Sequence, residues 1–407
     1  MTPTVPLRHP ATPQSVPGPA LAPFARALGL REPTSEQFRE LGEALTKGDR
    51  PMDELVEWMY DQGMASTRPL FERASRDGIT AVPEAPAPLR EFFEYVETVP
   101  DWVDWNKIRH AELISGLGSR DALYAARDMS FLGGYLASGF NKTLIRTGAL
   151  EKGPAKRFAE TTQWAMDVTA PGGMRRYGVG FRSTVHVRMI HSMVRRHVSA
   201  MPDWQAEEWG LPINQTDMAA TLVGALIAPM VGGIGLGMVT TPRDTDAMAH
   251  FTRYVGWVMG VEERFLPNGF RDSVRILYHT MTAITNPDET TPRLAVPMGD
   301  DPLGWHYRHL SGVRRRIARS QHLSLATMFL GPAAMKELGL PAHTPPWYPI
   351  LRIPVNLARS TWARVIPGQL ERAAAKGRTS QESFIRTLAG PGAAVIGESA
   401  QHIGHAA

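Results

Sequence analysis

The sequence predicts an all-α protein built as a single large helical domain. Apolar residues recur at helical spacing along nearly the whole chain, and the alternation of apolar and polar residues that marks a strand is scarce. With 407 residues, 43% of them hydrophobic and 21% charged, the chain is able to bury a sizeable core. This composition excludes collagen-like, fully disordered and disulfide-stapled proteins.

Turn and breaker residues separate the predicted elements along the chain. Gly48 and Pro51 divide the first two helices, an Ala/Pro-rich stretch over residues 81–88 precedes the third, and Gly153-Pro154 follows a long segment with an uncharged centre. That segment covers residues 121–147. The helical patterns cover residues 35–47, 52–62, 89–99, 108–114, 155–168, 180–199, 218–239, 245–260, 269–285, 304–328 and 355–364.

The two ends of the chain differ in composition from its middle. Residues 1–30 hold seven prolines before Arg26 and predict an extended arm, while residues 367–407 are rich in Ala and Gly and predict a peripheral segment. The helical domain then covers residues 31–366. The N-terminus shows no basic-then-apolar signal pattern, so we expect a cytoplasmic location.

Residues 218–239 are uncharged and long enough to span a bilayer. They are also rich in Ala and Gly, are interrupted by Pro229 and have no Lys/Arg asymmetry at their ends. We therefore expect a helix buried on all sides rather than a stable membrane span. A helical lipid-binding protein without a cofactor remains an alternative that rests on this segment.

Charge and cysteine content limit the chemistry. The absence of cysteine excludes Fe–S clusters, thiolate ligands and cysteine nucleophiles, so a metal must be held by His, Asp or Glu. The net charge is +4, and the arginines are scattered along the chain, which does not indicate a nucleic-acid partner. The P-loop, GxSxG, HExxH and EF-hand patterns are absent from the sequence.

His191 is the histidine whose position is most informative. Val187, Val194 and Val198 lie four residues before it and three and seven residues after it, which places the imidazole on the apolar stripe of its helix. A neutral imidazole that faces an apolar interior needs a partner, and the iron of a porphyrin is one. A core histidine that bonds a backbone carbonyl is the alternative.

Arg188 and Arg195 lie three residues before and four residues after His191. If His191 ligates haem iron, these guanidinium groups are candidates to reach the haem propionates.

The preceding helix contributes a second candidate group. Arg157, Thr161 and Trp164 are spaced so that they share one helix face, and they could line a small polar pocket within apolar surroundings. The alternative is that Arg157 simply pairs with Glu160 or Asp167.

At these residues the sequence resembles the latex clearing proteins (rubber oxygenases) and the broader MpaB-like oxygenases. The resemblance runs from about residue 90 to residue 330. It is carried by Arg157-(x)3-Thr161-(x)2-Trp164, by residues 167–173 (DVTAPGG), by Val187-Arg188-(x)2-His191-(x)3-Arg195-Arg196 and by residues 209–215 (WGLPINQ).

The resemblance implies a globin-like haem-binding core with additional peripheral helices, which assigns residues 31–366 to a haem-binding oxygenase domain. It also implies one non-covalent b-type haem, with His191 as the proximal iron ligand and with Arg157 and Thr161 on the distal side. A histidine ligand and the lack of a Cys-x-x-Cys-His motif agree with haem that is not covalently attached.

Two positions depart from the family pattern. Glu160 stands where characterised rubber oxygenases carry a lysine that can cap the iron. Their catalytic glutamate lies upstream of this helix, where an ungapped comparison places Asn141, with Glu151 ten residues closer to the helix. Either the acid has moved, with Glu160 as the candidate, or it is missing.

The resemblance therefore implies a b-type haem-dependent oxygenase. It would use O2 to oxidise or cleave a C=C bond of an apolar, isoprenoid or polyisoprene-like substrate to carbonyl products. A haem peroxidase or monooxygenase that acts on a soluble metabolite is one alternative. A non-catalytic haem- or gas-binding protein is another.

Overall fold

The computed structural model describes residues 5–14, 21–148, 150 and 153–390. Over these residues the chain forms helices and no strand, and one isolated bridge joins Ala137 to Asn286. The prediction of an all-α protein with one large helical domain is confirmed.

The helices begin and end at the following residues. The α-helices are α1 (Leu21–Ala27), α2 (Ser35–Ala44), α3 (Arg50–Asp61), α4 (Met64–Asp77), α5 (Ala87–Glu97), α6 (Trp105–Leu117), α7 (Ser119–Ala125), α8 (Leu132–Gly134), α9 (Ser138–Arg146), α11 (Pro154–Val168), α12 (Val179–Ser199), α13 (Ala206–Trp209), α14 (Gln215–Leu226), α15 (Ala228–Gly235), α16 (Pro242–Met259), α17 (Phe270–Ile284), α18 (Thr290–Asp300), α19 (Ser311–Glu337), α20 (Trp347–Val365) and α21 (Gln369–Ala389). Three 3-10 helices, η1 (Ile79–Ala81), η3 (Glu263–Phe265) and η4 (Asp301–Gly304), and one π-helix, η2 (Ala126–Phe131), complete the set.

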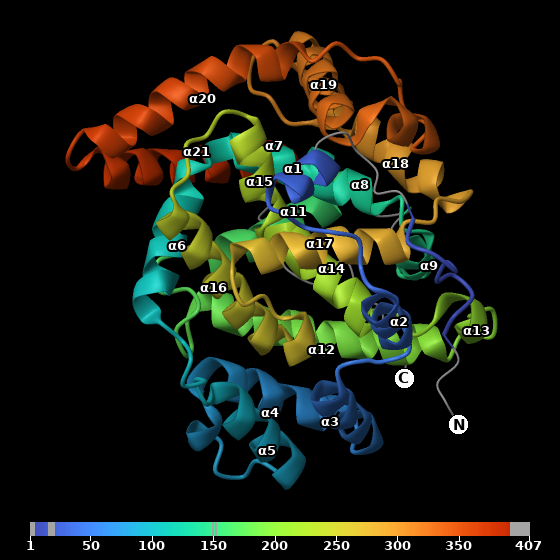
Figure 1. Cartoon of the computed structure of the whole chain (residues 1–407). Helices are drawn as coiled ribbons and strands as arrows, with labels where there is room; N and C mark the ends of the chain where they lie inside the picture. The colour runs from blue at the N-terminus through green and yellow to red at the C-terminus, as the bar shows by residue number, and fades with distance from the viewer. Residues whose placement is uncertain (1–4, 15–20, 149, 151–152, 391–407) are drawn as a thin grey trace.

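The helices surround two apolar clusters. α12, α14, α16 and α17 lie in the middle of the molecule, with α3 to α5 on one side and α18 to α21 on the other (Figure 1). The first cluster joins the N-terminal helices to the middle ones, and the second joins α7 and α8 to α18, α19 and α21.

The apolar segment over residues 218–239 forms two helices rather than one. α14 and α15 meet at Ile227 with a 40° bend, and Pro229 occupies the first turn of α15, where its missing N–H leaves no bond unmade. Among the described residues, no helix by itself has the length and apolar composition of a membrane span. α14 and α15 have the length and apolar composition of a span only when the two helices are counted together.

The long segment over residues 121–147 is also interrupted. α7 continues into the π-helix η2 and the short α8, and α9 then starts at Ser138 after a break. A π-turn inside a helix is rare and often marks a functional site.

The N-terminal arm is held against the core. Arg8 forms a buried ion pair with Asp217, 2.7 Å from Nη2 to Oδ2, and the Leu7 amide donates to the Glu207 carbonyl at 3.0 Å. α1 lies within the stretch that was predicted to be extended, whereas residues 1–4 and 15–20 fall outside the described residues.

The C-terminal segment differs from the prediction, because α21 packs against α6, α7 and α11 instead of lying at the periphery. Phe384 sits edge-on against Tyr124 of α7, with ring centroids 4.9 Å apart. Gly377 of α21 crosses Gly116 of α6 so closely that a Cβ at Gly377 would overlap the Gly116 carbonyl. The peripheral assignment is therefore corrected for these residues, and residues 391–407 fall outside the described ones.

We predict that Gly377→Ala destabilises the protein by about 1–3 kcal/mol, because the added methyl group meets backbone that has no room to move. Urea unfolding measures the effect. Gly312→Ala is the matched control, since a Cβ there meets nothing within 4 Å. Equal stabilities of the two variants would contradict the close crossing of α6 and α21.

Candidate functional site

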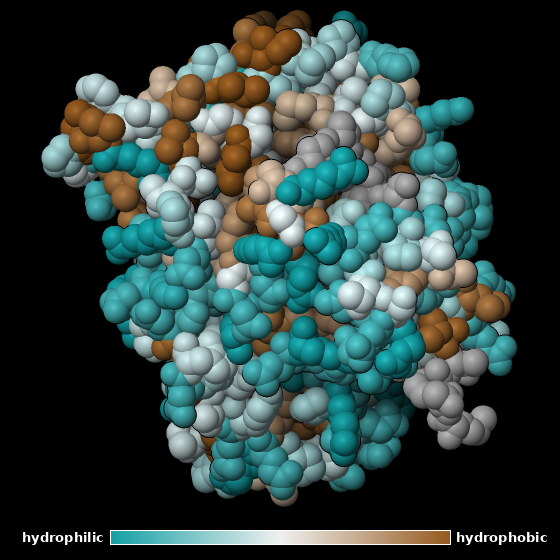
Figure 2. Space-filling model, in the orientation of Figure 1, coloured by the Kyte–Doolittle hydropathy of each residue, from teal (hydrophilic) through white to brown (hydrophobic). Residues whose placement is uncertain are grey.

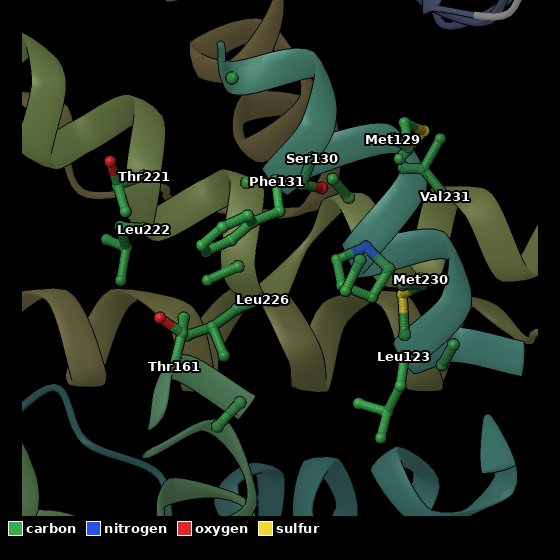
Figure 3. A pocket seen from close by; sticks show the side chains of 18 of the residues that line it. Leu123, Met129, Ser130, Phe131, Thr161, Thr221, Leu222, Leu226, Met230 and Val231 are labelled. Carbon is green, nitrogen blue, oxygen red and sulfur yellow. The ribbon is translucent and has the colours of Figure 1, made fainter. Parts of the chain in front are cut away.

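A cavity of about 660 Å³ is lined by residues of both apolar clusters. This volume is in the range of about 300–1,000 Å³ that is typical of small-molecule sites. Its wall is mainly apolar, and much of it comes from the two segments with uncharged centres, residues 129–140 and 218–239. Figure 3 shows Phe131 of η2, Leu226 of α14 and Thr161 of α11 around the same space.

His191 of α12 lines this cavity and has no partner for its buried nitrogen. Among the described residues nothing accepts from or donates to the ring, and Nδ1 is fully buried. The alternative of a core histidine that bonds a carbonyl is therefore not what these residues form. Burial lowers the pKa of His191 to about 4, and the charge of Arg195 acts in the same direction, so the imidazole is neutral at pH 7.

The polar side chains of α11 that line the same cavity as His191 include Arg157, Glu160 and Thr161. Burial lowers the pKa of Arg157 from its ordinary value, while the charges of Tyr135 and Glu160 oppose that shift. The Arg157 guanidinium lies 5.9 Å from the centroid of the Phe131 ring. α11 thus contributes polar groups to a mainly apolar wall, to which other helices add Asp217, Asp244, Ser360 and Arg364.

The Thr161 hydroxyl is already engaged by its own helix. Its Oγ1 donates to the Arg157 carbonyl at 3.1 Å, so the oxygen presents lone pairs rather than a proton to the cavity. A ligand beside Thr161 would therefore find Oγ1 as a hydrogen-bond acceptor, unless the hydroxyl group rotates and gives up its bond to the Arg157 carbonyl.

Glycines set the distance between α11 and α12. A Cβ at Gly180 would overlap the backbone of Val168, so the start of α12 packs directly on the end of α11. One turn further along, the Trp164 indole N–H donates to Thr184 Oγ1 at 3.1 Å. The two helices therefore present Thr161 and His191 to one cavity.

Arg188 and Arg195 lie outside the cavity wall, in contrast to the expectation from sequence. Arg188 forms a buried bidentate pair with Asp49, 2.5 Å from Nε and 2.8 Å from Nη2, and Arg195 pairs with Asp53. Arg195 also donates to the Ile213 carbonyl at 2.8 Å. Both arginines join α12 to the N-terminal end of α3, so we no longer assign them to haem propionates.

The segment over residues 209–215, which contributed to the family resemblance, has a structural role here. Asn214 caps α14 by accepting from the Asp217 amide at 3.0 Å. Gln215 is buried, and its side chain donates to the carbonyls of Gly48 and Gly260 at 2.9 and 3.0 Å. This segment therefore fixes the start of α14, whose later residues line the cavity.

The three positions considered for a catalytic acid differ in where the structure places them. Glu160 is buried and lines the cavity. Asn141 is fully buried outside the cavity wall, where its Nδ2 donates to the Tyr135 carbonyl at 2.7 Å. Glu151 falls outside the described residues. Of the two described positions, Glu160 is the one that the structure brings to the site.

Sequence reasoning missed part of the wall. The π-helix contributes Met129, Ser130 and Phe131, from the uncharged stretch 129–140 that was already a candidate for an apolar channel, whereas α20 contributes Ser360 and Arg364, which no sequence pattern singled out. A π-turn has no signature in a single sequence, and α20 is more than a hundred residues away from α15. The uncharged centre of residues 129–140 was the available signal for the first group.

His191 is the one histidine among the described residues that line the cavity. Among the described residues, no three His, Asp or Glu side chains come together to hold an ion. A metal at His191 would therefore rest on one imidazole, and an apolar cavity around that imidazole suits a flat, largely apolar macrocycle.

Comparisons with known proteins identify the family of this chain. A family model described as the catalytic domain of ER-bound oxygenase mpaB/B′ and rubber oxygenase matches residues 119–363. A rubber oxygenase from Streptomyces sp. (strain K30) is 23% identical over 231 residues, a match that covers 54% of this chain and 54% of that protein. The chain thus spans about half the length of this curated relative.

The fold is similar to a solved structure of latex clearing protein LCP in the closed state. The TM-score is 0.58 at 19% sequence identity, over 83% of this chain and 91% of that chain. At this level of identity the similarity concerns the fold alone.

We predict a pH-dependent loss of stability, in the protein without a bound ligand, that depends on His191. The folded state keeps this imidazole neutral down to about pH 4, whereas the unfolded chain binds a proton near pH 6.5. The contribution of His191 is complete above pH 6.5 and is lost as the pH falls towards 4, by up to about 3 kcal/mol. Urea unfolding of the wild type and of His191→Leu at both pH values measures it, and parallel curves would refute the assignment.

The ion pair between Arg188 and Asp49 predicts a second effect. Asp49→Asn leaves a buried guanidinium without its carboxylate and is expected to reduce stability by about 3–5 kcal/mol. Glu54→Gln removes the exposed partner of Arg50 nearby and should leave stability unchanged. Thermal unfolding of both variants measures the contrast, and a neutral Asp49→Asn would show that the Val258 carbonyl, which accepts from Arg188 at 3.0 Å, is a sufficient partner.

Proposed function

This chain belongs to the family of ER-bound mpaB/B′ oxygenases and rubber oxygenases, and we propose that it is a haem-dependent oxygenase. We propose further that it uses O2 to oxidise or cleave a C=C bond of an apolar, isoprenoid-like substrate to carbonyl products. The observation that carries the proposal is the unpartnered imidazole of His191 in a cavity that also receives Arg157, Glu160 and Thr161.

The residues present fit a b-type haem. His191 would hold the iron through its imidazole, and the apolar side chains of η2, α14 and α15 would contact the macrocycle. The bound haem would supply the activation of O2. Since the predicted propionate contacts with Arg188 and Arg195 are replaced by carboxylate pairs, the cavity-facing Arg157 is the cation that we propose for one propionate or for the reacting oxygen.

The side chains of α11 would act on charge and protons. In an apolar cavity an electrostatic interaction is stronger than in water, so the Arg157 cation would attract negative charge that develops on oxygen. The Glu160 carboxyl group is the group that we propose for holding or moving a proton. The Thr161 hydroxyl would orient a small ligand through its lone pairs.

The apolar wall would select the substrate and exclude water. A soluble, polar metabolite would lose its hydration in this cavity and find few partners there, whereas an alkene chain loses little. This contrast is our reason for preferring an isoprenoid-like substrate over a soluble metabolite. A polymer substrate is part of the proposal because the similar Streptomyces protein is named a rubber oxygenase.

Absorption spectroscopy and oxygen uptake test the proposal. We expect the purified wild type to show a Soret band, and His191→Ala to lose most of its haem because the iron loses its protein ligand. His197→Ala, on the same helix but outside the cavity wall, is the control and should retain haem.

The variants Arg157→Ala and Thr161→Ala separate chemistry from cofactor binding. Each should keep the Soret band and slow alkene-dependent oxygen uptake by about 10²-fold. A wild type that binds haem but consumes no oxygen with any alkene would indicate a carrier. Full haem content in His191→Ala would refute the ligand assignment.

A further inference from the structure

The exposed apolar side chains gather in one part of the chain. Of the fourteen large hydrophobic residues that are exposed among the described ones, eleven lie between Leu303 and Val365. Six of them form what we call the α20 apolar face: Ile350, Leu351, Val355, Leu357, Trp362 and Val365. Figure 2 shows hydrophobic residues gathered over the position of α20, and contiguous exposed patches of this kind indicate an interaction surface.

α20 has the reverse of the usual polarity of a helix on a water-soluble protein. Its polar residues point inward, where Arg352 and Asn356 bond Asp121 at 2.6 and 2.9 Å and Ser360 is buried. Its apolar residues point outward, with Leu351 and Trp362 about 60% exposed. Water does not stabilise this orientation, so the outer face needs another partner.

The start of α19 extends this surface with positive charge. Leu310, Val313 and Ile317 are exposed there and alternate with the exposed Arg314 and Arg316. The indole N–H of Trp347, at the start of α20, donates to Ser320 Oγ of α19 at 3.1 Å, so the start of α20 lies beside the first half of α19.

The charge of this part of the chain is strongly one-sided. Residues 302–368 contain nine Lys or Arg residues and a single acid, Glu337, which gives a net charge of +8 in a chain whose total is +4. Three of the nine, Arg319, Arg352 and Arg364, pair with acids outside this range, and the others include the exposed Arg314 and Arg316. The rest of the chain is therefore net negative. Exposed apolar residues next to cations are the pattern of segments that lie on anionic membranes.

We propose that the α20 apolar face and the start of α19 dock on the surface of an anionic lipid membrane. A second copy of this chain fits less well, because two such surfaces would bring like charges together. An uncharged polymer surface would leave Arg314 and Arg316 without a partner. Since no single described helix has the properties of a membrane span, α20 would lie along the lipid–water interface.

Docking in this orientation has a consequence for the cavity. Ser360 and Arg364, on the inner side of α20, line the cavity, so the membrane-facing helix also forms part of the cavity wall. An apolar substrate dissolved in the bilayer would then lie one helix away from the site. This consequence, unlike the docking itself, rests on the proposed function.

Vesicle flotation with the full-length protein tests the proposal. We expect binding to phosphatidylcholine vesicles that contain about one third phosphatidylserine, weaker binding to phosphatidylcholine alone, and a loss of binding as salt is raised. The readout needs neither haem nor activity, so its failure is distinguishable from failure of the proposed function.

Two pairs of variants assign the binding to this surface. Leu351→Ser with Trp362→Ser should weaken binding at least about tenfold, because both side chains enter the interface. Leu7→Ser with Tyr95→Ser removes two hydrophobic residues that are exposed elsewhere and should bind like the wild type. Arg314→Gln with Arg316→Gln should weaken binding about fivefold for each arginine removed, whereas Arg50→Gln should not.

Several outcomes would overturn the proposal. These are equal binding to neutral and anionic vesicles, no binding to either, or an equal loss in the Leu7/Tyr95 control. Light scattering that shows a dimer, which Leu351→Ser with Trp362→Ser converts to a monomer, would identify the surface as a self-interface. Salt-independent binding to an uncharged hydrocarbon emulsion would instead identify an apolar polymer as the partner.

Discussion

The candidate site depends on the direct backbone contact between α11 and α12 at Gly180. Because any Cβ at this position would overlap the Val168 backbone, the two helices approach each other more closely than side chains would allow. The bond from Trp164 to Thr184 then fixes their relative rotation. This contact is why groups from two helices line one cavity, and the apolar clusters on either side supply most of the apolar wall around those groups.

α12 separates two very different environments. On the side of α3, its buried guanidinium groups are matched by Asp49 and Asp53, so the charges that the fold removes from water are neutralised there. His191, which stands between these two arginines in the chain, lines the mainly apolar cavity and stays neutral. Polar groups that serve stability are thus paired with other side chains of the protein, whereas the imidazole is left available for a ligand.

Local patterns predicted what depends on local structure. The helix with His191 was expected over residues 180–199 and spans Val179–Ser199, because apolar periodicity and its glycine boundary are both encoded within the segment. The partners of Arg188 were not predictable, since Asp49 lies 139 residues away. The bend between α14 and α15 and the π-turn of η2 also escaped prediction, because packing against other helices decides them.

Because η2 is a π-helix, the number of residues in this segment determines the shape of the cavity. A π-turn holds one residue more than an α-turn, and each residue of an α-helix turns the chain by about 100°. Loss of one residue from Ala126–Phe131 would therefore rotate everything that follows and carry Gly133 and Gly134 away from the cavity wall. A single-codon deletion in this segment would reshape the cavity more than most substitutions, and relatives that differ here by one residue should differ in the ligands they accept.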